Sequence, residues 1–323
     1  MANSSAFYCV TNRAHFLGTV ALLNSIRLVG HQDPFFVLDC GLAANQRTLL
    51  EPHVTLVPAP ATPLARLVKW FAPLEHPADR MILLDSDVIA ARPLTELIER
   101  AEGGVLVGFA DDRPERFFAA WGEVLETKLL RRHTYLNSGF FVLPGNPGLT
   151  VLQLLRTVQL RIAAERPWMT RISQADEPFY YPDQDAWNAV FNGLLRPDQL
   201  SVLEHRLAPF APFKDIRVAD ERTLRCSYAD GTEPFLLHHV NQKPWLDSTT
   251  PNVYSQLLPR LLLESDVELR LPAQLVPLRL KKGSVATLER LRVQSVAAAR
   301  GGGFRPRAAW RKLTRQDTQT DLE

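Results

Sequence analysis

Hydrophobic residues in the first part of the chain form short runs that alternate with segments of helical spacing. Residues 6–11 (AFYCVT), 34–39 (PFFVLD) and 54–58 are apolar and β-prone, whereas 17–29 and 45–50 carry apolar residues at the period of a helix. Strands alternating with helices predict an α/β fold, a sheet of parallel strands with crossover helices. In such sheets ligands bind beyond the carboxyl ends of the strands.

The same alternation continues to about residue 240. The expected elements are an amphipathic helix at 64–75, a buried strand at 80–89, a helix at 94–100, strands at 104–110 and 135–143, and a helix at 148–165. Residues 113–134 are charged and partly helical, and we interpret them as a flexible insertion over the ligand-binding edge. No glycine-rich loop follows the first strand, so neither a dinucleotide fold nor a P-loop enzyme is supported.

The strand at 80–89 (RMILLDSDVI) ends its apolar run in Asp85 and Asp87. Side chains alternate along a strand, which would place both carboxylates on one side, one pleat repeat apart. Like charges this close are normally tolerated only when a cation sits between them. Two solvated acids at a strand end give the same pattern, so the pair alone leaves both interpretations open.

Three later segments concentrate polar chemistry. Residues 135–143 (YLNSGFFVL) open a β-prone run with a small polar triplet, for which an ordinary turn is the alternative. Pro182 and Asp183 predict a helix start, and capping alone would explain Asp183 or Asp185. Residues 238–245 (HHVNQKPW) follow an apolar run and supply two histidines and a lysine.

Composition narrows the class of protein. With 323 residues, 46% of them hydrophobic, the chain suits one large domain or a domain with an appendage, and a net charge of +2 gives no sign of a specific nucleic-acid partner. Its three cysteines, far apart and odd in number, fit neither a disulfide framework nor a Cys-x-x-Cys metal site. We found neither a signal-peptide pattern nor an apolar stretch long enough to span a bilayer, and expect a cytoplasmic protein.

The composition changes near the C-terminus. Residues 270–315 hold twelve lysines or arginines against one acid, Glu289, with apolar residues interleaved. Such a segment binds anionic surfaces through non-specific electrostatics, and a merely solvated tail is the alternative. We therefore expect a catalytic domain at 1–262 and a basic, partly helical or disordered extension at 263–323, with peripheral contact at the inner face of a membrane.

Four motifs stand in one order within residues 6–250: LLDSDV, YLNSGFF, DQDAWNAVF and HHVNQKPW. Together they resemble the retaining glycosyltransferases of family eight, the glycogenin and lipopolysaccharide galactosyltransferase group. The resemblance implies a GT-A fold, a Rossmann-like mixed sheet flanked by helices. It also implies transfer of a sugar from a nucleotide-diphosphate sugar, with UDP as the expected nucleotide, to a saccharide or glycoconjugate acceptor.

The resemblance also implies a metal site. Asp85, Asp87 and a histidine would bind Mn²⁺, or Mg²⁺ in its place, and Lys243 would contact the diphosphate. The family has its histidine six residues before the lysine with a glycine between, whereas here His238 stands five before it and Asn241 takes the place of the glycine. The ligand is therefore His238 or His239, and the order of the motif favours His238.

Other roles follow from position in the family pattern. The residues concerned are Thr11 and Asn12 near the base, Lys69 near the donor phosphates or ribose, Ser86 with the donor, Asn137 near the transferred sugar, and Asp183 and Gln184 near the anomeric carbon. A covalent intermediate would need a nucleophile, and Gln184 is a poor one. This favours a front-face reaction in which Asp183 and Gln184 orient the reactants.

Two other functions compete with sugar transfer. The run MILLDSDVIA also fits the nucleophile motif of haloacid-dehalogenase-like phosphatases, with Asp85 as the nucleophile. A non-catalytic sugar-nucleotide-binding or membrane-adaptor protein, working through its basic tail, is the second alternative. The oligomeric state is not readable from the sequence.

Overall fold

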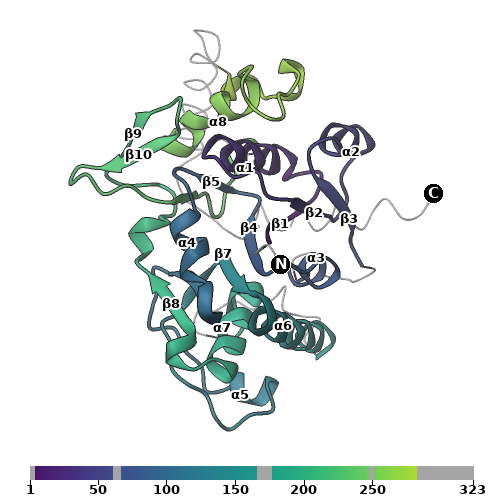
Figure 1. Ribbon diagram of the computed structural model, residues 1–323, viewed down its shortest axis with the longest axis vertical. Helices are drawn as coiled ribbons and strands as arrows, with labels where there is room; N and C mark the ends of the chain where they lie inside the picture. The colour runs from purple at the N-terminus through teal and green to yellow at the C-terminus, as the bar shows by residue number, and fades with distance from the viewer. Residues whose placement is uncertain (1–3, 61–66, 166–176, 247–250, 282–323) are drawn as a thin grey trace, which may run out of the picture.

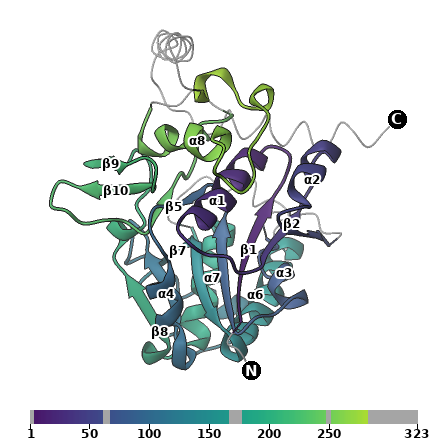
Figure 2. The same cartoon turned by 45° about the horizontal axis from the view of Figure 1, so that its top comes forward.

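The computed structural model describes residues 4–60, 67–165, 177–246 and 251–281, and its centre is a seven-stranded mixed sheet in the order β3-β2-β1-β4-β7-β6-β8 (Figures 1 and 2). The strands are β1 (Ser5–Thr11), β2 (Phe35–Asp39), β3 (Thr55–Pro58), β4 (Arg80–Asp85), β6 (Leu106–Ala110), β7 (Leu136–Pro144) and β8 (Leu200–Leu203). Neighbouring strands are parallel except at β7, which runs antiparallel to both β4 and β6. The first residues of β7 therefore lie at the edge where β4 ends.

Helices cover both faces of this sheet, as the alternation of apolar residues requires. Along β1, Phe7 and Cys9 join one buried cluster while Ala6 and Tyr8 join the other. The first cluster includes residues of α1 (Phe16–Leu28), α2 (Ala44–Leu50), α4 (Thr95–Arg100) and α8 (Val253–Leu263). The second includes residues of α3 (Phe71–Glu75), α5 (Trp121–Val124), α6 (Gly145–Glu165) and α7 (Pro182–Leu194).

Two short ribbons complete the described part of the chain. β9 (Ile216–Asp220) pairs with β10 (Arg225–Tyr228), and β5 (Val88–Ala90) pairs antiparallel with β11 (Leu236–His238). In the second ribbon His238 lies opposite Val88, which is the residue after Asp87. This pairing brings the HHVNQKPW motif directly against the two aspartates.

The strand expected at 80–89 is not continuous. β4 ends at Asp85, Ser86 and Asp87 form a turn, and β5 begins at Val88. The expectation that Asp85 and Asp87 share one side of a continued strand is therefore wrong. The turn lets the two carboxylates approach one point from different directions.

The helix expected at 64–75 is also shorter than predicted. Its first residues lie outside the described chain, and residues 67–70 form a turn before α3. The Trp70 indole N–H donates to Leu67 O at 2.8 Å, and the Lys69 ammonium is 2.7 Å from Asp85. We attribute the non-helical course to the long-range pairing of Lys69 with Asp85, which overrides the helical spacing of the sequence.

The segment 113–134, expected to be a flexible insertion, is anchored to the core. Arg116 donates two hydrogen bonds to the carboxylate of Asp185, at 2.8 and 2.7 Å, and the Tyr135 hydroxyl donates to the same group at 2.6 Å. The Trp121 side chain is completely buried. Asp185 is thus a structural residue that joins this segment to the start of α7.

The chain beyond α8 packs on the same core. Leu271, Val276 and Leu280 are buried within the first cluster, so the basic segment that starts at residue 270 begins inside the folded body. Asn24 on α1 fastens this part through bonds to Leu261 O, Leu269 O and Leu269 N at 2.6, 2.9 and 2.9 Å. The predicted boundary at 262/263 stays a prediction, and the basic residues from 282 onward lie outside the described residues. In the described part, no helix combines the length and apolar character of a bilayer-spanning segment.

We expect Asn24→Ala to destabilise the protein. The change would leave three buried backbone groups of the C-terminal segment without partners, at a cost of about 2 to 4 kcal/mol. Urea unfolding monitored by circular dichroism measures this loss. Asn45→Ala, at an exposed position of α2, should change the free energy of unfolding by less than about 0.5 kcal/mol. Equal stabilities of the two variants would contradict the assigned role of Asn24.

Candidate metal and donor site

A close approach of three chain segments holds the turn at Ser86. Gly18 in the first turn of α1 lies so near that an added Cβ would be 2.3 Å from Ser86 O and 2.6 Å from the Trp245 ring. Trp245 in turn donates its indole N–H to Ala14 O at 2.9 Å. The start of α1 and the HHVNQKPW loop therefore clamp the turn that carries the aspartates, and only glycine fits at position 18.

Asp85 faces the layer of α3 and α7. The Lys69 ammonium lies 2.7 Å from Asp85 Oδ1 and 2.6 Å from Asp183 Oδ2, and it donates to Ser138 O at 3.0 Å. Although burial lowers the pKa of Lys69, the two carboxylates raise it above the ordinary value. Burial raises the pKa of Asp183 against the opposing effect of Lys69. Lys69 thus joins a metal-ligand candidate to a residue expected near the anomeric carbon.

Asp87 faces the opposite layer. Lys243 donates to Asp87 Oδ2 and, at 2.6 Å, to His239 O, while His239 N donates to Asp87 O at 2.9 Å. Burial alone would raise the pKa of the Asp87 carboxyl, but Lys243 and His238 hold it well below the ordinary value. Asp87 is therefore a carboxylate over the whole physiological range of pH.

Asp85, Asp87 and His238 bring one ligand atom each to a common point, with all three atoms within 4.8 Å of one another. His238 Nε2 is 3.1 Å from Asp87 Oδ1 and 3.8 Å from Asp85 Oδ2. Asp87 Oδ1 and His238 Nε2 are fully buried and make no hydrogen bond of good geometry within the described chain. Each aspartate gives its other oxygen to a lysine. Two carboxylate oxygens and one imidazole nitrogen fit Mn²⁺ or Mg²⁺.

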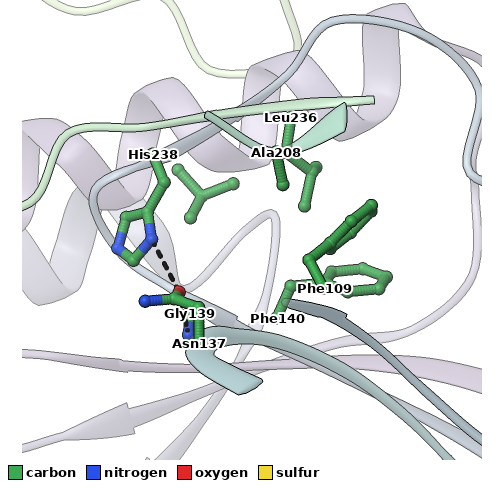
Figure 3. Close-up of a pocket in the computed structure, with 8 residues that line it drawn as sticks. Phe109, Asn137, Gly139, Phe140, Ala208, Leu236 and His238 are labelled. Atoms are coloured by element: carbon green, nitrogen blue, oxygen red, sulfur yellow. Dashed lines mark hydrogen bonds between the residues drawn. The ribbon is translucent and has the colours of Figure 1, made fainter. Parts of the chain in front are cut away.

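Asn137 fixes the orientation of the His238 ring, on the side opposite the two aspartates (Figure 3). Its Nδ1 lies 3.0 Å from Asn137 Oδ1, which leaves Nε2 to face the carboxylates. Gly139 makes room for the ring, since an added Cβ would come within 2.3 Å of its Cε1 atom. His239, the other candidate, points away and contacts Asn252 of the α8 cap at 3.1 Å. The geometry therefore favours His238 as the ligand.

Asp111, which the sequence did not single out, lies on the side of the site expected to face the sugar. Gln184 Oε1 accepts from Asn137 Nδ2 at 2.8 Å and from Ser138 N at 3.1 Å, and Gln184 Nε2 donates to Asp111 Oδ2 at 3.0 Å. Burial, followed by the nearby Asp112, raises the pKa of Asp111 to about 6. The only signal in the sequence was an acidic pair directly after the strand at 104–110.

Thr11 and Asn12 lie at the end of β1, next to the strand that ends in Asp85. Thr11 Oγ1 accepts from Thr19 Oγ1 at 2.6 Å. Asn12 Oδ1 accepts from the backbone N–H groups of Ala14 and His15, at 3.0 and 3.1 Å, which shapes the start of α1. Both side chains thus build the loop beside the site, and their contact with a base stays a prediction, as does that of Ser86 with the donor.

Comparisons with known proteins identify the fold. No protein-family model matches the chain, and no curated protein matches it. Among solved structures, the galactosyltransferase LgtC in complex with donor and acceptor sugar analogs is 17% identical over 81% of this chain and 98% of LgtC, with a TM-score of 0.51. The apo structure of the bifunctional glycosyltransferase WbbM is 16% identical over 83% of this chain and 50% of its own, with a TM-score of 0.53. The glycosyltransferase GlyE of Streptococcus pneumoniae TIGR4 is 16% identical over 81% of this chain and 61% of its own, with a TM-score of 0.52.

At these identities the likeness concerns the fold. The mixed sheet flanked by helices is the fold of these glycosyltransferases, and the expected GT-A fold class is confirmed. An active-site mutant of LgtC, 16% identical over the same share of both chains, has the same fold with a TM-score of 0.51.

We expect Gly139→Ala to weaken metal binding without unfolding the protein. The new methyl group would collide with the His238 ring and displace Nε2 from the aspartates, which should cost at least about tenfold in Mn²⁺ affinity. Electron paramagnetic resonance of free Mn²⁺ measures the loss. Gly145→Ala is the matched control, because its added Cβ would meet its nearest atom at an ordinary 3.5 Å. Unchanged affinity in Gly139→Ala would remove His238 from the ligand set.

We expect Asp111→Asn to change the pH dependence of stability. The folded Asp111 carboxyl binds its proton more tightly than the ordinary value of 3.8 would allow, so the wild type loses stability as pH rises through the interval from 3.8 to about 6. The variant lacks this titration. Its free energy of unfolding relative to wild type should therefore increase by about 2 kcal/mol between about pH 4 and pH 7.5. Urea unfolding of both proteins at the two pH values measures this change. A stability difference between variant and wild type that is the same at both pH values would contradict the raised pKa of Asp111.

Proposed function

We propose that this protein is a metal-dependent retaining glycosyltransferase that moves a sugar from a nucleotide-diphosphate sugar, with UDP as the expected nucleotide, to a saccharide or glycoconjugate acceptor. The observation that carries the proposal is the convergence of Asp85, Asp87 and His238, with a lysine on each carboxylate, at the strand ends of a fold that LgtC shares. The LgtC structure holds donor and acceptor sugar analogs, which supports a nucleotide sugar and a carbohydrate as the ligands here.

Charge explains why a cation suits this site. Transfer breaks the bond between the anomeric carbon and a phosphate oxygen, and the diphosphate leaves with growing negative charge. When Asp85, Asp87 and Asp183 are ionised, they outnumber Lys69 and Lys243 by one, so the protein groups alone would repel that leaving group. A bound Mn²⁺ or Mg²⁺ reverses the sign and supplies Lewis-acid stabilisation of the diphosphate. We expect Lys243, which is paired with Asp87, to contact the same oxygens.

The hydrogen bonds of Gln184 support a front-face reaction. Its Oε1 accepts two hydrogen bonds, from Asn137 and from Ser138 N. The lone pairs of this weak nucleophile are therefore already engaged, which disfavours its attack on the sugar. Asp183 is held by Lys69 and by Gln159, whose amide donates at 3.1 Å. We assign Asp183, Gln184 and Asn137 to orienting the sugar and the acceptor, with no covalent intermediate.

The competing functions have less support. The phosphatase alternative has Asp85 as an attacking nucleophile, whereas Asp85 Oδ1 is engaged by Lys69 and the fold is shared with glycosyltransferases. A binding-only protein would not require an Asp-Asp-His group together with Lys69, Asp183 and Gln184 at one edge. We therefore retain sugar transfer as the function that the geometry favours.

We expect Asp87→Asn to lower the rate of Mn²⁺-dependent hydrolysis of a nucleotide sugar by at least about 100-fold. The change removes one anionic ligand and the charged partner of Lys243. A panel of nucleotide sugars, assayed without acceptor by release of nucleoside diphosphate, measures this and identifies the donor. Asp198→Asn, in an exposed ion pair, should behave as wild type. Full activity of Asp87→Asn with an intact circular dichroism spectrum would reject the proposal.

We also propose that the protein works in the cytoplasm, at the inner face of a membrane. Leu275 and Leu278, 36% and 44% exposed, lie just before the basic residues that continue from Lys281, and Leu246, 43% exposed, lines the same shallow pocket as Leu275. Exposed leucines beside a basic segment are what an anionic bilayer surface binds.

We expect truncation after residue 281 to reduce binding to vesicles that contain anionic lipid, measured by co-sedimentation, and to leave the folded body intact because residues 271–280 pack on it. The double change Leu275→Ser with Leu278→Ser should reduce binding further. The control pair Leu129→Ser with Leu160→Ser removes leucines elsewhere on the surface that are 59% and 43% exposed and should have no effect. Vesicle binding that persists after truncation would remove the tail from the proposal.

A further inference from the structure

His239 is the second histidine of HHVNQKPW, and the site described above gives it no ligand role. Its side chain is buried, and Nε2 lies 3.1 Å from Asn252 Nδ2. Asn252 Oδ1 accepts from Ser255 N at 3.0 Å and so caps α8. That bond fixes the orientation of the amide, with the result that Nδ2 donates and His239 Nε2 accepts.

The backbone of His239 is part of the metal and diphosphate centre. Its N–H donates to Asp87 O at 2.9 Å, and its carbonyl accepts from the Lys243 ammonium at 2.6 Å. A single residue thus holds the main chain of one metal-ligand candidate and the side chain of the diphosphate lysine. A shift of the His239 main chain would therefore move both groups.

Two aromatic rings support the ring of His239. Tyr254, in the first turn of α8, packs edge-on against it with ring centroids 5.1 Å apart, and Phe213, in the loop before β9, does so at 5.8 Å. These aromatic contacts restrain the tilt of the ring. The hydrogen bond from Asn252 adds a directional contact at Nε2, on the ring edge away from Cβ.

We propose that Asn252, acting through His239, is a positioning residue for the metal and diphosphate centre, so that the C-terminal helix α8 sets the geometry of Asp87 and Lys243. This inference rests on the proposed function. Outer partners of metal ligands typically change metal affinity by about 10- to 100-fold when removed. Asn252 contacts the centre only through His239, so we expect its removal to lower metal affinity by about tenfold, the lower end of that range.

Asn252→Ser separates positioning from capping. Serine caps a helix about as well as asparagine but is too short to reach His239. We expect an unfolding midpoint close to that of wild type and about tenfold weaker binding of Mn²⁺ in the presence of UDP, measured by electron paramagnetic resonance of free Mn²⁺. Ser255→Ala is the reciprocal control: it removes the bond from Asn252 N to Ser255 Oγ and spares His239. It should lower the midpoint while leaving Mn²⁺ affinity unchanged.

His239→Phe provides a second route to the same bond. Phenylalanine keeps the aromatic packing and the backbone but cannot accept from Asn252. If both residues act through one hydrogen bond, the double variant should bind Mn²⁺ no more weakly than His239→Phe alone. Additive losses, or wild-type affinity in Asn252→Ser, would overturn the inference while wild-type binding still supports the proposed function. A wild-type protein that binds no Mn²⁺ with UDP would overturn both.

Discussion

The repulsion between Asp85 and Asp87 is the constraint on which the rest of the site depends. Asp85 Oδ2 and Asp87 Oδ1 converge beside His238, yet neither aspartate is left as a bare charge, because a lysine holds the other oxygen of each. The two lysines come from opposite layers of the molecule. Lys69 reaches Asp85 from the side of α3, and Lys243 reaches Asp87 from the loop that packs under α1 and α8. The site is therefore assembled only when both layers close on the sheet.

The reversed strand β7 is what makes this assembly compact. Because it runs against β4, its first residues stand beside the last residues of that strand. Asn137 can then orient His238, and Gly139 can let the ring approach. Gly18 has the same function on the other side, where it admits Ser86 O and Trp245. Gly18 and Gly139 thus determine how closely the Ser86–Asp87 turn, Trp245 and His238 can approach one another.

Much of the fold was predictable because strands and helices follow from the local spacing of hydrophobic residues. The strands at 6–11 and 34–39 and the helix at 17–29 were placed to within one residue, and four motifs in order indicated the edge of the sheet. Tertiary contacts explain the failures. Lys69 lies in a turn that the helical spacing did not indicate, since its ion pairs with Asp85 and Asp183 were invisible in sequence. Asp111 escaped notice because acids after a strand are common, and only the fold reveals that Gln184 reaches it.

The start of α7 shows why residue type alone could not separate structure from chemistry. Asp183 and Asp185 stand two residues apart on one helix, and such residues point in nearly opposite directions, about 160° apart around the axis. Asp183 consequently meets Lys69 at the site, whereas Asp185 is completely buried beneath Arg116 and Tyr135. Neither side chain caps its helix in the simple sense, because the cap residue is Tyr181. The same type of residue thus serves as an orienting group at Asp183 and as a buried anchor at Asp185.

The loop from His238 to Lys243 departs from the pattern of the glycosyltransferase family that its motif resembles, and its backbone explains how the departure is tolerated. Asn241 stands where the pattern has glycine, and its φ is 66°, in the left-handed region. Asparagine is among the few residues other than glycine that adopt this region at low cost. The conformational requirement signalled by the glycine is therefore met by a different residue. With one residue fewer before Lys243, the loop still places that lysine on Asp87, and the ring of His239 is turned toward α8.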